Sequence, residues 1–308
     1  MVEQAQGLRE WIKGQSIQAQ KEVLDARTAG SRVVAVTSGK GGVGKSQITL
    51  NLALALQKLG QRTIILDADL GLANINILLG YEPSYTLWDV VQKHLSVRDV
   101  MQQGPLGLSI IPGGSGISQL ASLNTKEIDT IIKGFQELES EFDWLLVDTA
   151  AGISPGVLSF VLAADEALIV TNPEPPALAD AYGLIKSIWQ VQGRVSLELV
   201  MNRSVSLKSG EEMGMRVINL TKKMLNQNVG FFGAVREDTH SARAISRQIP
   251  LVLLYPASPA AQDIGDMAER MIHRIKPAKR GRWEQFIYRM GRMWSSWPKA
   301  EDGPEESK

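Results

Sequence analysis

The segment that most constrains this 308-residue chain is a glycine- and lysine-rich turn between a strand pattern and a helical pattern. The apolar run 32–37 precedes the turn, and the helical pattern covers residues 47–59. The turn itself reads Ser38-Gly39-Lys40-Gly41-Gly42-Val43-Gly44-Lys45-Ser46. Its glycines let backbone N–H groups converge on one anion, Lys45 adds positive charge at the β- and γ-phosphates, and the Ser46 hydroxyl can ligate Mg²⁺. The segment therefore predicts a phosphate-binding loop for a nucleotide.

A second lysine, Lys40, stands near the start of this loop, where binding a phosphate within one chain does not require it. With both lysines, residues 40–46 resemble the deviant Walker A motif of the MinD/ParA family of P-loop ATPases. In that family the early lysine crosses a dimer interface to the partner's nucleotide. The resemblance therefore implies an ATP/ADP-dependent homodimer and catalytic roles for Lys40 and Lys45. It implies nucleotide contacts from Gly39, Lys40, Gly41, Gly42, Val43, Gly44, Lys45, Ser46 and Gln47.

Apolar runs of strand length alternate with helical segments along most of the chain. The predicted strands are 33–37, 63–66, 108–111, 144–147, 167–170, 197–201, 230–235 and 251–254. The predicted helices include 126–138, 176–191, 211–225 and 259–275, with one or two outer helices within 81–107. Several strands are apolar throughout, as in parallel sheets that are covered on both faces. This pattern predicts one α/β domain with a doubly wound, mainly parallel sheet flanked by helices, and a ligand at the carboxyl ends of its strands.

Three carboxylates follow predicted strands. Asp67 and Asp69 come after the run 63–66, and Asp148 comes after the run 144–147. Any one of them could be a turn or cap residue, but phosphoryl transfer needs Mg²⁺ and a group that orients the attacking water. The family resemblance implies that Asp148 is the Walker B acid, that Asp69 positions the hydrolytic water, and that Asp67 supports them. Together with Ser46, Asp69 and Asp148 are the expected Mg²⁺ set, mostly through water.

A polar pair, Asn202 and Arg203, ends the run 197–201. The resemblance implies that Asn202 hydrogen-bonds the adenine edge and that Arg203 also contacts the nucleotide. An asparagine that only makes a turn is the alternative.

The first 30 residues are polar, with the apolar residues Leu8, Trp11 and Ile12 at helical spacing, which predicts a short helical arm before the domain. A solvated terminus is the alternative. Residues 3–9 read Glu3-Gln4-Ala5-Gln6-Gly7-Leu8-Arg9. This resembles the Asp-Gln-Ala-x-x-Leu-Arg activator motif of FlhG proteins, the flagellar-number ATPases of the MinD/ParA family, with Glu3 in place of Asp. The resemblance implies binding and stimulation of the GTPase FlhF by Gln4, Ala5, Leu8 and Arg9. It also implies control of flagellar number and placement, with switch-ring (C-ring) proteins as further partners.

The C-terminal region carries an apolar stripe at helical spacing. Its members are Trp283, Phe286, Ile287, Met290, Met293, Trp294 and Trp297, accompanied by Arg280, Arg282, Arg289 and Arg292. A basic, tryptophan-rich amphipathic helix suits the headgroup region of an anionic membrane. Packing on the protein's own core is the alternative. The resemblance favours a membrane helix, because MinD and many FlhG proteins carry one here, and it implies an ADP monomer that becomes an ATP-bound, membrane-associated dimer.

The predicted organisation has five parts: an activator arm (1–30), the ATPase domain (31–275), a linker (276–281), the amphipathic helix (282–297) and a tail (298–308). A membrane-spanning helix needs about 18 or more consecutive apolar residues, and every apolar run in the sequence is shorter than that. The N-terminus lacks a secretory signal pattern. We therefore expect a cytoplasmic protein that associates reversibly with the inner face of the cell membrane.

Composition narrows the functional alternatives. The 33 Lys and Arg residues balance the 33 Asp and Glu residues, so nucleic acid is not predicted as a partner. With no cysteine, the chain cannot supply thiolates to an iron–sulfur cluster, unlike the cluster-carrying members of the family. The leading hypothesis is a slow, dimerisation-dependent ATPase of the FlhG type. A MinD-like division-site ATPase, a ParA-type DNA-segregation ATPase and a metabolic ATP-dependent ligase are the alternatives.

Overall fold

The computed structural model describes residues 31–69, 74–113, 125–191, 195–274 and 281–296. Within these ranges the chain forms one eight-stranded sheet in the order β3-β4-β2-β5-β1-β6-β7-β8. All neighbouring strands are parallel except β3, which pairs antiparallel with β4 at the edge. The strands are β1 (Arg32–Ser38), β2 (Thr63–Ala68), β3 (Gln102–Gln103), β4 (Ser109–Pro112), β5 (Trp144–Ala151), β6 (Glu166–Thr171), β7 (Ser196–Ser204) and β8 (Gly230–Arg236).

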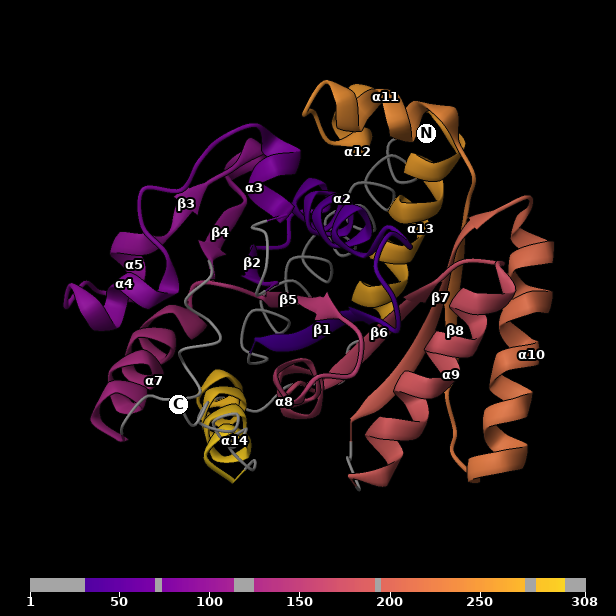
Figure 1. The fold of residues 1–308 in the computed structure, drawn as a ribbon. Helices are drawn as coiled ribbons and strands as arrows, with labels where there is room; N and C mark the ends of the chain where they lie inside the picture. The colour runs from indigo at the N-terminus through magenta and orange to yellow at the C-terminus, as the bar shows by residue number, and fades with distance from the viewer. Residues whose placement is uncertain (1–30, 70–73, 114–124, 192–194, 275–280, 297–308) are drawn as a thin grey trace, which may run out of the picture.

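Helices cover both faces of this sheet (Figure 1). One hydrophobic core lies between the sheet and α2 (Lys45–Lys58), α3 (Asn74–Leu79), α11 (Thr239–Ser246), α12 (Leu251–Leu254) and α13 (Pro259–His273). The core of the other face is formed with α4 (Leu87–Gln92), α5 (Val97–Val100), α7 (Thr125–Glu139), α8 (Pro155–Ala163), α9 (Pro175–Gln190), α10 (Leu207–Leu225) and α14 (Arg282–Ser296). A short 3₁₀ turn, η1 (Pro105–Gly107), leads into β4. The predicted doubly wound α/β fold is confirmed.

One predicted strand is wrong. The run 251–254 forms the helical turn α12, because the chain reverses at Pro250 and the following N–H groups bond locally. The N–H groups of Leu253 and Leu254 both donate to the Pro250 carbonyl, and that of Val252 donates to Asn51 Oδ1. A four-residue apolar run carries too little periodicity to separate a buried turn from a buried strand.

The helix predicted over 282–297 is α14, and it lies against α7 and α8 (Figure 1). Four members of its apolar stripe are buried in the core: Trp283, Phe286, Ile287 and Met290. Met293 is partly buried, whereas the Trp294 side chain and Trp297 lie outside the described residues. The stripe expected to face a membrane therefore faces the protein in this structure. The proposed FlhF contacts Gln4, Ala5, Leu8 and Arg9 also lie outside the described residues.

The described part of the chain holds no helix that is both long and apolar enough to cross a membrane.

Candidate nucleotide-binding site

The glycine-rich loop joins the carboxyl end of β1 to the first residue of α2 at the centre of the sheet. Gly42 and Gly44 adopt left-handed φ angles of 81° and 93°, which residues with a Cβ atom rarely take. A Cβ atom at Gly44 would also collide with the side-chain amide of Asn202. At the start of the loop, a Cβ at Gly39 would collide with the α9 backbone at Asp180. The loop therefore needs glycine at positions 42 and 44 for its curvature. It needs glycine at position 44 for its close approach to β7, and at position 39 for its close approach to α9.

The N-terminus of α2 is open to an anion. Its N-cap residue, Gly44, offers no side chain to the first N–H groups, and the first turn of this fully described helix contains no acidic residue. Unpaired N–H groups and the positive end of the helix dipole both favour a bound phosphate. This arrangement fits the phosphates of a nucleotide.

Behind the loop lies a buried ion pair. Lys45 Nζ is 2.9 Å from Asp148 Oδ1 and 3.3 Å from Ser46 Oγ. Thr49 Oγ1 donates to the same Asp148 oxygen at 2.9 Å. The other oxygen, Asp148 Oδ2, is buried and has no hydrogen-bond partner among the described residues. A buried carboxylate oxygen without a partner is costly, so a water held by Mg²⁺ beside Ser46 would fit this position.

Asp67 lies beside Asp148 in the register of β2 and β5. Its two oxygens accept from the N–H groups of Asp69, at 3.3 Å, and Ile75, at 3.1 Å. Burial, reinforced by the charge of Asp148, raises the pKa of Asp67 to about 7 in spite of these hydrogen bonds. Asp67 thus accepts from one residue on each side of segment 70–73, and its supporting role in catalysis stays a prediction.

Asp69 faces the same space as the loop. Its Oδ2 accepts from Asn74 Nδ2 at 2.6 Å, so α3 fixes the orientation of the carboxylate. The two side chains line a cavity of ≈ 390 Å³. The other lining residues are Ser38, Gly41, Gly42, Gly44, Lys45, Ser46, Gln47, Ile77, Leu78, Ala151 and Ile245. The structure therefore brings together Asp69 and most of the predicted loop residues in one cavity, with Asp148 paired to Lys45 behind it, whereas Gly39, Lys40 and Val43 do not line that cavity.

Lys40 has a partner that the sequence analysis did not anticipate. Its Nζ donates to Glu174 Oε2 at 3.1 Å, and both side chains are partly exposed. Glu174 is the N-cap residue of α9. Within one chain, Lys40 is therefore held at the rim of the site by an ion pair that solvent weakens.

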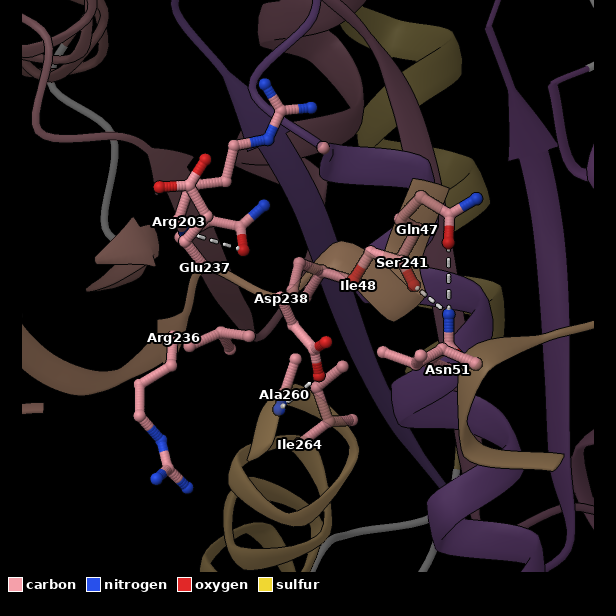
Figure 2. Close-up of a pocket in the computed structure, with 14 residues that line it drawn as sticks. Gln47, Ile48, Asn51, Arg203, Arg236, Glu237, Asp238, Ser241, Ala260 and Ile264 are labelled. Carbon is pink, nitrogen blue, oxygen red and sulfur yellow. Dashed lines mark hydrogen bonds between the residues drawn. The ribbon is translucent and has the colours of Figure 1, made fainter. Parts of the chain in front are cut away.

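A second, smaller cavity of ≈ 70 Å³ adjoins the loop and shares Gly44 and Gln47 with the first (Figure 2). Asn202 and Arg203 line it, as expected of nucleotide contacts. In this structure Asn202 Nδ2 donates to the Val43 carbonyl at 2.8 Å, and its Oδ1 accepts from the Arg203 N–H at 2.9 Å. Asn202 therefore ties the loop to β7, and contact with an adenine edge stays a prediction.

The sequence analysis missed the far wall of this cavity, which is built from Ile48, Asn51, Val235, Arg236, Glu237, Asp238, Ser241, Leu251, Ala260 and Ile264. Asp238 organises it: one oxygen accepts from the His240 N–H at 2.9 Å, and the other accepts from the Ala260 N–H at 3.2 Å, the second of which is drawn in Figure 2. Burial opposes ionisation of Asp238, but hydrogen bonds from His240, Ser258 and Ala260 outweigh it and lower the pKa to about 2. The sequence did contain one signal for this wall: Asp238 comes just before the helical pattern 239–246, and aspartate is a favoured N-cap residue.

The described residues contain no group of three or more His, Asp or Glu side chains that could hold a metal ion by themselves. The arrangement instead suits a divalent ion bound jointly by Ser46, the phosphates and waters near Asp148.

Comparison with known proteins identifies the family. The ParA family model, described as an NUBPL iron-transfer P-loop NTPase, matches residues 30–272. MinD in the MinC:MinD complex of Aquifex aeolicus has 29% sequence identity and a TM-score of 0.63, covering 81% of this chain and 99% of that chain. MinD of Pyrococcus horikoshii, solved with Mg-ADP, has 26% identity and a TM-score of 0.62, covering 78% of this chain and 96% of that chain.

Two curated flagellar proteins are also similar. The antiactivator FleN of Pseudomonas aeruginosa is 37% identical over 260 residues, covering 84% of this chain and 93% of FleN. The flagellum site-determining protein YlxH of Helicobacter pylori is 29% identical, covering 80% of this chain and 83% of YlxH. The chain belongs to the MinD/ParA family of P-loop ATPases, in the FlhG branch that includes FleN and YlxH.

Proposed function

We propose that this protein is a nucleotide-driven switch that controls the number and placement of flagella. The observation that carries the proposal is a loop of the deviant Walker A type that opens on the same cavity as Asp69, in a chain similar to FleN and YlxH. ATP binding and slow hydrolysis set the state of the switch, so the lifetime of each state matters more than the turnover number.

Each residue of the site has a proposed task. The loop N–H groups and Lys45 bind the β- and γ-phosphates, and Ser46 and Asp148 hold Mg²⁺ with its waters. When bound, Mg²⁺ neutralises negative charge that develops on the phosphates. Asp69, oriented by Asn74, positions the attacking water. Gln47, Asn202 and Arg203 contact the nucleoside part from the second cavity.

Lys40 links nucleotide binding to assembly in this proposal. In the single chain it is paired with Glu174, the N-cap residue of α9. In an ATP-bound homodimer it leaves Glu174 and reaches the nucleotide of the partner. Because the Lys40–Glu174 pair is partly exposed, breaking it costs little.

The proposed membrane attachment requires α14 to leave the domain. Four of its apolar residues, Trp283, Phe286, Ile287 and Met290, are buried, and the helix packs against α7 and α8, so docking keeps these four side chains from lipid. The docked arrangement suits the monomer with ADP or without nucleotide, and the undocked helix suits an ATP dimer at an anionic membrane. Binding to FlhF through Gln4, Ala5, Leu8 and Arg9, and to C-ring proteins, completes the proposed cycle.

The first test is the stimulation of FlhF. A peptide of residues 1–24 is added to FlhF from the same organism, and GTP turnover is measured with a Gln4→Ala peptide as the control. Stimulation that the control loses would support the flagellar assignment. No stimulation by either peptide would remove the FlhF role and leave an ATPase of the MinD/ParA family without an assigned partner.

A MinD-like role in division is the second candidate, because the chain covers 99% of the Aquifex MinD chain at 29% identity. Deleting the gene separates the two candidates. Altered flagellar number with normal division favours the flagellar role, and minicells with normal flagellation favour the division role.

A further inference from the structure

The end of the sheet opposite the nucleotide site holds a junction between two segments that are far apart in the sequence. The indole Nε1 of Trp283 in α14 donates to Ser31 Oγ at 2.9 Å. Trp283 is 0% exposed and Ser31 is 2% exposed, so water cannot replace either partner. Ser31 stands directly before β1, and residues 1–30 continue from it. The C-terminal helix is therefore bonded to the position from which the N-terminal arm departs.

A second contact joins the same two segments through one carboxylate. Asp165 Oδ2 accepts from the Val33 N–H of β1 at 3.0 Å, and Asp165 Oδ1 lies 2.6 Å from Arg282 Nη1 of α14. Asp165 is thus shared between the start of β1 and the first turn of α14. Loss of the α14 partner would change the charge environment of a group that also holds Val33.

The first turn of α14 is capped from outside the helix. The carboxylate of Glu139, at the end of α7, accepts from the Gly281 N–H at 3.1 Å and from the Arg282 N–H at 2.9 Å. An N-terminal cap of this kind is lost as soon as the helix moves away from α7. Aromatic packing also stabilises the docked position of α14. Trp283 stacks on Phe142 and meets Phe135 edge to face, with ring centroids 6.0 and 5.8 Å apart.

We propose that docking of α14 and fixing of the chain at residues 31–33 are one cooperative event. The release of α14 rests on the proposed function, whereas the coupling rests on the junction alone. When α14 leaves, its indole can find a new partner at a membrane interface, whereas the Ser31 hydroxyl loses the buried donor that fixes it in the docked state. Residues 31–33 then lose the Ser31–Trp283 hydrogen bond, and Asp165, which accepts from the Val33 N–H, loses the Arg282 cation. The chain that precedes Ser31 then departs from a less constrained position.

Such coupling is reciprocal. An anionic membrane that binds α14 weakens the contacts that fix residues 31–33. Conversely, a protein that pulls on the N-terminal arm favours release of α14. Communication between the two ends of the chain therefore does not need to pass through the nucleotide site, which lies at the opposite end of β1.

The test uses the full chain without nucleotide and measures hydrogen exchange in residues 31–36 and in α14. Ser31→Ala leaves the indole N–H unpaired, and Trp283→Phe leaves the hydroxyl unpaired. We expect each variant to raise exchange in both segments by about 5-fold, and the double variant to differ little from either single one. Ser187→Ala removes a hydroxyl that bonds within α9 and is the matched control.

Additive effects in the double variant, or a Ser31→Ala variant that alters β1 alone, would overturn the coupling. Because Trp283→Phe also changes core packing, Arg282→Gln provides a second route. It removes the ion pair with Asp165 at a partly exposed position, and it should raise exchange at Val33 as well as in α14.

A vesicle experiment separates this inference from the proposed membrane role. Wild-type protein is mixed with vesicles of phosphatidylglycerol and phosphatidylcholine, and exchange is measured again in both segments. If α14 binds the vesicles, exchange in residues 31–33 must rise, and unchanged exchange there refutes the coupling. If the protein does not bind, the membrane role fails, while the variants still decide the coupling.

Discussion

Polar groups at the two ends of the sheet differ in whether they have partners within the chain. At the carboxyl end, the first N–H groups of α2 have no side-chain cap and Asp148 Oδ2 has no partner among the described residues. At the amino end, the indole of Trp283, the Arg282 guanidinium and the first N–H groups of α14 are all paired within the chain. The first end is built to accept a ligand from outside. The second end is already satisfied, so change there requires that internal contacts break.

The largest expected effect is at the carboxyl end. Asp69→Ala should lower ATP turnover by about 100-fold or more, because the attacking water loses the carboxylate that orients it. ATP affinity, measured by calorimetry, should stay unchanged, since the proposed phosphate contacts come from the loop and not from Asp69. Asn74→Ala, which removes only the 2.6 Å hydrogen bond to Asp69, should reduce turnover less. Normal turnover by Asp69→Ala would show that another group orients the water.

The next effect concerns assembly at the same end. Lys40→Ala should abolish the proposed ATP-dependent dimer, which light scattering would measure, while the monomer still binds nucleotide, because Lys45 and the loop N–H groups remain. Lys186→Ala, which removes an exposed lysine from α9, should dimerise normally. An ATP dimer of Lys40→Ala would refute a role for this lysine across the interface.

At the amino end, Phe160→Ala weakens the surface on which α14 lies but leaves the α14 stripe intact. Truncation of a buried phenylalanine costs about 3 kcal/mol, so the docked state should lose much of its advantage. We expect more protein to sediment with anionic vesicles. Phe232→Ala, on the other face of the sheet, should lower stability without this gain. Equal sedimentation of both variants would contradict α14 release.

The smallest effect is a pH dependence that belongs to the wall of the second cavity. The folded-state pKa of Asp238 is about 2, below the ordinary value of 3.8, so its stabilisation is present above pH 4. That contribution, on the order of 2 kcal/mol, should be lost as the pH falls from 4 to 2. Urea unfolding should therefore show a steeper acid loss in the wild type than in Asp238→Asn. Parallel pH profiles would show that Asp238 is not the group responsible.

The sequence predicted the carboxyl end of the sheet better than the amino end. The loop, Asp69 and Asp148 lie in short segments whose spacing carries their chemistry, and the apolar runs located every described strand longer than two residues, with one extra strand predicted at 251–254. Glu174, Asp165 and Glu139 were missed because their partners lie 134, 117 and 142 residues away. The α14 stripe has a clear helical period, but periodicity states which face is apolar and not what covers it.

The position of β1 has a mechanical consequence. This seven-residue strand lies in the interior of the sheet, between β5 and β6, and both pairings are parallel. A force applied to the chain at Ser31 would act along the strand and load the hydrogen bonds to both neighbours together, in shear, instead of opening them one at a time. The domain can therefore bear tension through its N-terminal segment, and the Ser31–Trp283 contact should yield long before β1 and the nucleotide loop at its far end.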